Sequence, residues 1–278
     1  MQHQEQQQHD DMPYNEHNVL FDHRTVTEII SKYCPSFTIG NIDIYRTSMV
    51  HKSYCTRKNE NFVEGNVKCP PSCLPLQEES NERLEFLGDA VLNLIIGNYL
   101  YDRYCDSDEG FLTRIRTKLV NGTMLAELNQ HASLPRFSII SKQIEENNGR
   151  LNKKILEDCF EGFLGAIFLD AQSQGKNALD VASQWVIGLI EDNLDFTELI
   201  KQNNNYKDAF LKYFQHNFNV LPKFIELSTD ATNNGKIFRV VIKDNNNTII
   251  GTGTGATKKS SENDAAKNAM LYFGVNLA

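Results

Sequence analysis

The chain has 278 residues, which is enough for two domains of ordinary size. Its composition, 40% hydrophobic and 23% charged, is that of a globular protein and excludes collagen, coiled coils and wholesale disorder. The longest apolar run, 90–100, contains Asn93, Gly97 and Asn98 and is well short of the ~20 residues of a membrane span. The N-terminus has no apolar signal-peptide core, so we expect an intracellular protein, in the cytoplasm or nucleus, without a membrane partner.

The formal net charge of −8 conceals an asymmetry between two parts of the chain. Residues 203–278 contain 9 basic and 6 acidic residues, a net of +3, whereas the remainder contains 19 and 30, a net of −11. Negative charge alone argues against a nucleic-acid partner, because phosphate binding is driven by Lys and Arg. The two parts therefore require separate interpretation.

Residues 1–18 are almost entirely polar and predict a disordered tail. From there the hydrophobic periodicity predicts an all-helical domain over 19–196, with no convincing strand. The expected helices lie at 26–33, 42–49, 82–104, 110–130, 153–171 and 178–193. Three prolines in 56–80 predict an irregular insertion within this domain.

The pattern changes after a short polar linker, 197–205. A helix is expected at 206–218, strands at 223–228, 238–243 and 248–252, and an alanine-rich helix at 260–273, with turns at 233–235 and 244–247. This order predicts a small α-β-β-β-α domain over 206–276, with its helices on one face of an antiparallel sheet. The fold class is therefore mainly α.

The helix predicted at 82–104 begins with carboxylates in an apolar setting. Leucine, valine and isoleucine recur at helical spacing and are expected to face the core, at Leu84, Leu87, Val91, Leu94 and Ile95. Glu85 and Asp89 are four residues apart and share a face, and Glu82 lies one turn earlier. Ionised carboxylates that are partly buried are costly unless a cation coordinates them.

A second segment repeats this arrangement. Asp158 and Glu161 share a helical face, and so do Glu157 and Glu161, so the spacing does not choose between Glu157 and Asp158. Gly162 and Gly165 would let another helix approach closely. Two such helices suggest one site built between them, and carboxylate ligands suit Mg²⁺ or Mn²⁺. The alternative is a solvated acidic stripe on two amphipathic helices.

The stretch 81–92, NERLEFLGDAVL, resembles the signature of the ribonuclease III family. Three further segments are similar to family elements in the expected order: HKSY at 51–54, LTRIRTKLV at 112–120 and ILEDCFEGFLGAIFLD at 155–170. The resemblance covers roughly residues 22–195 and implies an all-helical ribonuclease III domain.

The resemblance implies which residues are catalytic metal ligands, namely Glu85, Asp89, Asp158 and Glu161. It favours Asp158 over Glu157, where the family usually has a small residue. Glu82 and Glu109 match acidic positions that lie near the family's site and are expected to support the ligands. Lys154 stands where related enzymes often have a lysine. It either stabilises developing phosphate charge or merely opposes the acidic cluster.

The implied reaction is two-metal-ion hydrolysis of double-stranded RNA with Mg²⁺, for which Mn²⁺ can substitute, leaving 5′-phosphate and 3′-hydroxyl ends with short 3′ overhangs. One catalytic domain per chain implies a homodimer. Phe86 is a candidate for the dimer surface, and the alternative is ordinary core. The main rival function is a protein that sequesters double-stranded RNA without cutting it. A third is a structural subunit, which usually lacks some of the carboxylates.

The segment 258–266, KKSSENDAA, is similar to the KKxAExxAA element of the double-stranded RNA-binding domain. Lys258 and Lys259 at a helix start would form a phosphate clamp. The resemblance also places Gln215 at a minor-groove contact. Lys212 stands where the family often has Glu, and the loop before Phe238 lacks the usual Gly-Pro-x-His group.

The cysteines at 55, 69 and 73 allow one further interpretation. Cys55, Cys69 and Cys73, together with His51, could be drawn as a zinc site, although their spacing fits no tight zinc knuckle. We therefore regard zinc as the less favoured interpretation, with reduced thiols as the expectation.

Overall fold

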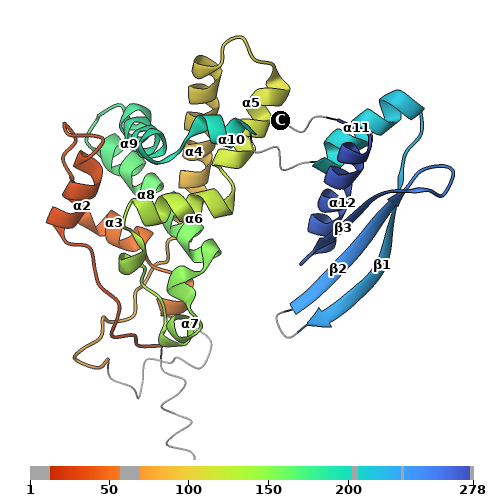
Figure 1. Ribbon diagram of the computed structural model, residues 1–278. Coiled ribbons are helices and arrows are strands. Elements are labelled where there is room, and N and C mark those ends of the chain that lie inside the picture. Colours follow the sequence, from red (N-terminus) through yellow and green to blue (C-terminus); the bar gives the residue numbers. More distant parts are fainter. Residues whose placement is uncertain (1–12, 57–68, 202–205, 233–234, 276–278) are drawn as a thin grey trace, which may run out of the picture. The chain divides into compact units, whose positions relative to one another are not determined.

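A computed structural model describes residues 13–56, 69–201, 206–232 and 235–275 (Figure 1). The chain divides into two compact units, Met1–Asp195 and Phe196–Ala278. The first is helical and the second contains a three-stranded antiparallel sheet with helices, as the sequence predicts. In the described parts of the chain, no helix has the length and apolar character needed to cross a bilayer.

The first unit is built around two long helices, α4 and α8, with shorter helices packed around them. Its α-helices are α2 (His23–Ser31), α3 (Ile42–Ser48), α4 (Glu82–Arg103), α5 (Glu109–Leu119), α6 (Gly122–His131), α7 (Lys142–Glu146), α8 (Lys153–Ser173) and α9 (Ala178–Asn193). Single 3-10 turns occur at η1 (Lys52–Tyr54), η2 (Pro135–Phe137) and η3 (Gly149–Leu151).

Helix α8 forms the centre of this unit because it is buried along most of its length. Its Phe160 and Phe163 pack against Trp185 of α9, with ring centroids 5.6 and 5.2 Å apart. A Cβ added to Gly165 would overlap the backbone oxygen of Leu84 in α4. The backbones of α4 and α8 therefore touch, as the glycines predicted.

Two sequence expectations for the helices are wrong. The helix predicted over 110–130 is broken into α5 and α6, because the Asn121 side chain accepts hydrogen bonds from the backbone N–H groups of Thr123 and Met124 and starts a new helix. Leu94, expected in the core, is 58% exposed. Helix α4 carries apolar residues on more than one face, and the sequence alone did not show which face is covered.

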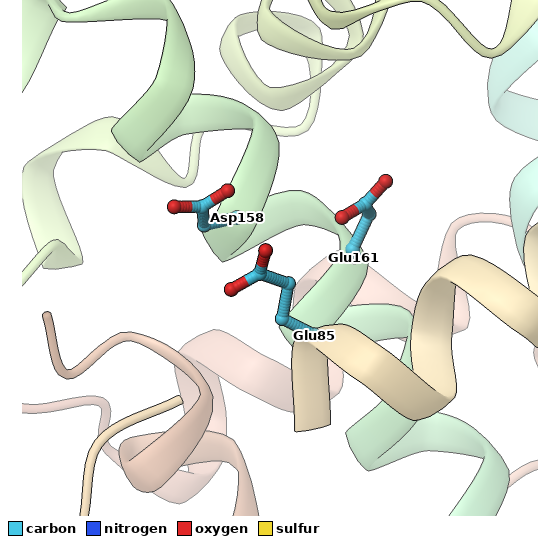
Figure 2. Close-up of side chains that lie close together, drawn as sticks. All are labelled: Glu85, Asp158 and Glu161. Carbon is cyan, nitrogen blue, oxygen red and sulfur yellow. The ribbon is translucent and has the colours of Figure 1, made fainter. Parts of the chain in front are cut away.

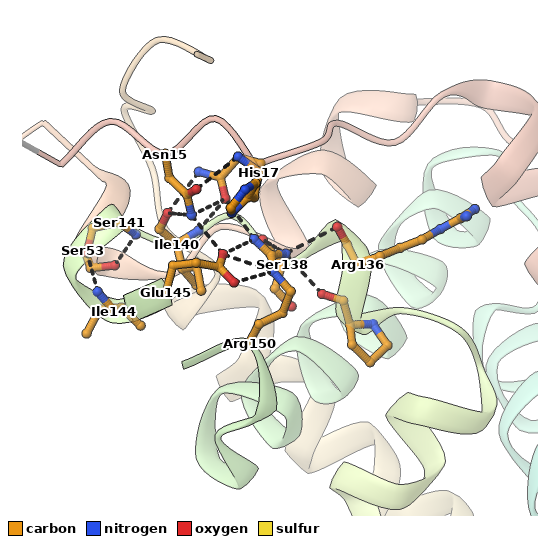
Figure 3. Close-up of polar contacts among 12 residues, drawn as sticks. Asn15, His17, Ser53, Arg136, Ser138, Ile140, Ser141, Ile144, Glu145 and Arg150 are labelled. Atoms are coloured by element: carbon orange, nitrogen blue, oxygen red, sulfur yellow. Dashed lines mark hydrogen bonds and ion pairs between the residues drawn. The ribbon is translucent and has the colours of Figure 1, made fainter. Parts of the chain in front are cut away.

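The predicted disordered tail is wrong for residues 13–18. Asn15 and Asn18 are buried, and both amides donate to the backbone oxygen of Ile140 (Figure 3). The Ile140 N–H in turn donates to Asn18 Oδ1 at 3.1 Å. Polar composition suggested a solvated segment, but these amides satisfy buried backbone groups instead. Residues 1–12 lie outside the described part of the chain.

The described part of the predicted insertion belongs to the first unit and bonds to the segment that precedes it. Cys55 forms an isolated parallel bridge with Gln77, and the Tyr54 hydroxyl donates to the backbone oxygen of Leu74 at 2.7 Å. The remainder of that prediction, residues 57–68, lies outside the described residues.

The second unit consists of α10 (Phe196–Lys201), α11 (Tyr206–Phe218), β1 (Lys223–Thr232), β2 (Gly235–Lys243), β3 (Ile249–Gly255) and α12 (Lys258–Tyr272). The strands lie in the order β1-β2-β3, with Phe224 opposite Ile242 and Val241 opposite Thr252. Helix α10 shows that the first part of the predicted linker is helical, while 202–205 and the turn residues 233–234 are outside the described chain.

Small residues let α12 lie directly on the sheet. A Cβ at Gly251 or Gly253 of β3 would overlap the backbone of Ala265 in α12. Ala265 and Ala269 are fully buried in a core with Phe210 and Val240. This contact fixes the start of α12 relative to the strands.

Candidate active site

Three carboxylates from α4 and α8 meet at the surface of the first unit. Glu85 comes from α4 and Asp158 and Glu161 from α8, and one oxygen of each lies within 4.8 Å of the others (Figure 2). Among the histidine, cysteine, aspartate and glutamate side chains that the structure describes, these three are the ones that lie close enough together to hold a metal ion. Glu161 is only 6% exposed, so it enters the site from within the helix packing.

Asp89, the fourth predicted ligand, is one turn further along α4 and exposed. Its carboxylate accepts a hydrogen bond from the Asn93 amide at 2.8 Å instead of joining the other three. It nevertheless lines the same open depression, of about 460 Å³, as Glu85 and Glu161. The structure thus brings three of the four residues together and places the fourth beside them.

The crowding of negative charge changes the acidity of these groups. Burial, followed by the charges of Asp89 and Glu157, raises the pKa of Glu161 to about 8. Burial and then the charge of Asp158 raise the pKa of Glu85 above its ordinary value. A cation would reverse both effects, since it favours the ionised forms. A set of hard oxygen donors in this environment fits Mg²⁺ or Mn²⁺.

Lys154, in the first turn of α8, is the cation closest to the carboxylates. Its Nζ lies 2.7 Å from Asp158 Oδ1, 3.5 Å from Glu85 Oε1 and 3.6 Å from Glu157 Oε2. The hydrogen bond with Asp158 is the largest cause of a raised pKa at Lys154, so the ammonium stays charged. The Asn152 side chain caps the N-terminus of α8 two residues earlier and fixes where the helix starts.

The two acidic residues expected to support the ligands differ in their placement. Glu82 lines the depression, and its carboxylate accepts from Lys52 Nζ at 3.2 Å and from the Ser80 hydroxyl at 3.1 Å. These hydrogen bonds, that of Lys52 first, lower the pKa of Glu82. Glu109, in contrast, is the first residue of α5 and accepts from the Thr113 hydroxyl at 2.8 Å. It is not among the residues that line the depression.

Sequence reasoning missed Lys52 and Asn93, which hold Glu82 and Asp89. Lys52 stands inside the segment HKSY, and Asn93 directly follows the segment NERLEFLGDAVL, one turn after Asp89. The four-residue spacing of Asp89 and Asn93 could have indicated their hydrogen bond. Phe86 is 81% exposed at the rim of the depression, which excludes the core alternative for it.

The residues expected to contact RNA lie on the surface of the second unit. Helix α12 begins at Lys258, and the Thr257 and Ser260 side chains cap its start reciprocally. Lys258 Nζ is 3.4 Å from Glu226 Oε2 of β1, so part of its charge is already offset. Lys259 and, on α11, Lys212 and Gln215 are exposed.

Among the described residues, His51, Cys55, Cys69 and Cys73 do not bring three potential zinc ligands close together. The Cys69 thiol lies 3.4 Å from the backbone oxygens of Cys73 and Leu74. All six cysteines of the chain are free thiols. The structure therefore gives the zinc interpretation no support.

Comparison with family models matches each unit separately. The model described as ribonuclease-III-like matches residues 41–189, and that of the double-stranded RNA binding motif matches residues 206–272. In a solved structure, the nuclease domain of ribonuclease III from Campylobacter jejuni, 97% of that chain aligns with 60% of this one, at 28% identity and a TM-score of 0.47.

Several relatives align with most of the chain. A "Probable ribonuclease 3" of Acanthamoeba polyphaga mimivirus is 33% identical over 256 residues, which are 91% of this chain but only 46% of that protein. "Ribonuclease 3" of Chlorobium chlorochromatii is 33% identical over 83% of this chain and 84% of its own length, and that of Streptococcus mutans 37% identical over 82% and 89%. The extent of these matches shows that the chain belongs to the ribonuclease III family.

Proposed function

We propose that this protein is an endoribonuclease that cuts double-stranded RNA with the help of Mg²⁺, for which Mn²⁺ can substitute. The observation that carries the proposal is the convergence of Glu85, Asp158 and Glu161 from two helices onto one point beside an open depression. Membership of the ribonuclease III family and the RNA-binding motif of the second unit support the substrate class.

The ligands of the metal ions would be the three converging carboxylates, together with Asp89 once it leaves Asn93. These residues would hold a pair of divalent ions, whose chemistry would be to activate water and to offset the charge of the leaving oxygen, leaving 5′-phosphate and 3′-hydroxyl ends. The chain itself supplies the geometry. Burial of Glu161 and the close packing of α4 and α8 hold the carboxylates in place before the substrate arrives. Glu82, held by Lys52, adds negative charge at the rim.

The active form would be a homodimer, in which two sites cut opposite strands and leave short 3′ overhangs. Helix α4 exposes Phe86, Leu94 and Tyr101, which are 81%, 58% and 70% exposed. Their spacing of eight and seven residues places them on one face of the helix. An exposed apolar stripe of this kind marks an interface, and a symmetric dimer would cover the same stripe in both subunits.

The second unit would hold the RNA through Lys258 and Lys259 at the start of α12, with Lys212 and Gln215 of α11 contributing further contacts. Amides at a helix N-terminus favour phosphate, and the two lysines add positive charge there. Such a domain reads duplex shape and backbone largely without sequence preference.

The direct test uses a long RNA duplex, incubated with the full chain and with Mg²⁺ or with chelator, and separated on a denaturing gel. We expect cleavage only with the metal ion, and products that ligate directly through their 5′-phosphate ends. The rival function, sequestration without cutting, predicts a stable complex and intact RNA under both conditions. The four carboxylates are all present, which favours cutting over that rival and over a purely structural subunit.

A further inference from the structure

Lys154 lies among the carboxylates that would bind the metal ion. Its ammonium contacts Asp158 at 2.7 Å and Glu85 at 3.5 Å, and thereby connects the two helices of the site. The side chain is nevertheless 63% exposed. A lysine ammonium is a compact charge on a flexible stem. Lys154 can therefore leave the carboxylates without any change in the packing of α4 and α8.

Glu157 is a second partner of the same ammonium and lies beside the start of α6. Its Oε2 lies 3.6 Å from Lys154 Nζ. A Cβ added to Gly122, the first residue of α6, would be 2.6 Å from Oε2 of Glu157. The carboxylate thus lies against the N-terminal end of α6, where the helix dipole favours negative charge. Glu157 does not belong to the three residues whose oxygens converge, so it stands beside the cluster and not within it.

We infer that Lys154 is the resident cation of the metal-free site, and that Glu157 holds Lys154 once a divalent ion has taken its place. The inference rests on the proposed function. Without any cation, Glu85 of α4 and Asp158 of α8 would face each other across the contact between the helices with nothing to offset their charge. A divalent ion carries twice the charge of the ammonium and displaces it from Glu85 and Asp158.

Because of the position of Glu157, the Lys154 ammonium has only a short distance to move in this exchange. Lys154 and Glu157 are three residues apart on one helix, so the ammonium needs only a change of rotamer to move from Asp158 to Glu157. Lys154 then acts as an internal competitor that lowers the affinity for metal. Glu157 is a positioning residue that reduces this competition by accepting the displaced charge.

Titration of Mn²⁺ into the full chain, with free Mn²⁺ followed by electron paramagnetic resonance, tests the exchange without reference to cleavage. Lys154→Met should bind Mn²⁺ roughly tenfold more tightly than the parent, because no ammonium has to be displaced. Glu157→Gln should bind it roughly threefold more weakly. In the double variant the effect of Glu157→Gln should disappear, since there is no ammonium left to hold.

The double variant separates this inference from simple attraction. If Glu157 only attracted the ion through space, Glu157→Gln would weaken binding equally in both backgrounds, and the role of Glu157 would be overturned. If Lys154→Met left the affinity unchanged or weaker, the role of Lys154 would be overturned. Lys154→Arg keeps the charge and should stay close to the parent, and Lys154→Gln repeats the test with a polar side chain.

Thermal melting supplies a second measurement. Metal-free Lys154→Met should melt at a lower temperature than the parent, and saturating Mn²⁺ should raise its melting temperature by more. A parent that binds no Mn²⁺, or a Glu161→Gln variant that binds it as the parent does, would overturn the proposed function itself. Loss of binding in Glu161→Gln, combined with parental affinity and melting in Lys154→Met, would overturn only the exchange.

Discussion

Gly88 of α4 packs directly against the backbone of Glu161 in α8, and a Cβ added at residue 88 would overlap the carbonyl oxygen of Glu161. The residue that carries the most deeply buried carboxylate of the site is therefore also a contact point between the two helices. Any side chain at position 88 has to push the helices apart, and with them Glu85 and Glu161.

Gly88→Ala should for this reason lower both stability and cleavage. Overpacking of a close contact costs ~1–3 kcal/mol, and we expect a correspondingly lower midpoint in urea together with loss of cleavage. The matched control is Gly110→Ala in α5, outside the exposed stripe of α4, where an added Cβ meets only Asp108 Oδ1 at an ordinary contact distance of 3.5 Å. That change should be neutral or stabilising by up to about 1 kcal/mol. Equal effects at the two positions would show that the helix contact is not responsible.

Glu161→Gln should abolish cleavage while leaving double-stranded RNA binding nearly intact. The amide keeps the shape of the side chain but removes the charge that would hold the metal ion, and the RNA-binding unit is unchanged. Cleavage is measured on a denaturing gel with Mg²⁺, and binding by gel shift with chelator. Glu146→Gln, an exposed carboxylate of α7 paired only weakly with Lys142 at 3.9 Å, serves as the control and should cut normally. Cleavage by Glu161→Gln at the parental rate would refute the assignment of the site.

Leu94→Glu should convert the proposed homodimer into monomers without unfolding the chain. The residue lies in the exposed stripe of α4 and away from the carboxylates. A charge there should therefore destabilise a subunit interface without affecting the fold of the single chain. Sedimentation analysis or light scattering gives the mass of the particle in solution. Val19→Glu, at a residue 52% exposed outside the stripe, should keep the mass of the parent. A Leu94→Glu protein that is still dimeric would place the interface elsewhere.

Lys258→Ala combined with Lys259→Ala should weaken RNA binding and reduce the dependence of log affinity on log salt by about two units, since each phosphate contact contributes about one. Because Glu226 offsets Lys258, Lys259→Ala alone should have the larger effect of the two single changes. Lys267→Ala, further along α12 and above the ring of Tyr206, should leave the slope unchanged. A slope unaffected by the double change would show that RNA is bound elsewhere.

Arg150→Ala should be strongly destabilising because it leaves the Glu145 carboxylate, whose side chain is only 20% exposed, without its charged partner. Arg150 Nε lies 3.1 and 3.0 Å from the two oxygens of Glu145, and its Nη1 donates to the backbone oxygens of Pro135 and Ser138 (Figure 3). Removal of one partner of such a pair costs ~3–5 kcal/mol. Arg24→Ala is the control, since its pair with Glu28 is exposed on both sides and should contribute little to the free energy of unfolding.

The pair of Arg150 and Glu145 also predicts how the destabilisation by Arg150→Ala depends on pH. Burial by itself raises the pKa of Glu145, but hydrogen bonds from Arg150 and Asn15 outweigh it, and the pKa in the folded protein lies below its ordinary value of 4.5. The stabilisation is therefore present above pH 4.5 and is lost as the pH falls through the folded pKa. In Arg150→Ala only the hydrogen bond from Asn15 still opposes burial, so the pKa of Glu145 should rise relative to the parent. The difference in free energy of unfolding between the parent and Arg150→Ala, measured in urea, should be largest near pH 7 and should shrink towards pH 4. A difference that does not change with pH would contradict the assigned charges.

The positions of the long helices and the convergence of carboxylates between them follow largely from helical spacing, whereas the preference for Asp158 over Glu157 came from the resemblance to the ribonuclease III family. Glu85, Asp158 and Glu161 stand at helical intervals next to glycines, so that two helices in contact must bring them together. The spacing left Glu157 and Asp158 equivalent. What separates them is the position of α6, a contact between distant parts of the chain that helical periodicity does not contain.

The other wrong predictions arise from side-chain hydrogen bonds, which hydrophobic periodicity does not reveal. Asp89 lies at the right interval, yet its carboxylate turns to Asn93 of its own helix. Asn121 ends one helix and starts the next because its side chain can replace backbone partners. Asn15 and Asn18 read as solvated tail, although they bond to a backbone segment more than a hundred residues away.

The N-terminal contact has a practical consequence for anyone who shortens this protein. The match to the family model begins at residue 41, but a fragment starting there would lack Asn18 and the buried Phe21. Ile140 would lose the hydrogen-bond partners of its backbone N–H and C=O groups. Phe137 would lose its contact with Phe21, whose ring centroid lies 4.2 Å away. A catalytic fragment intended for crystallisation should therefore begin no later than Pro13, whose backbone oxygen is already bonded to Lys142.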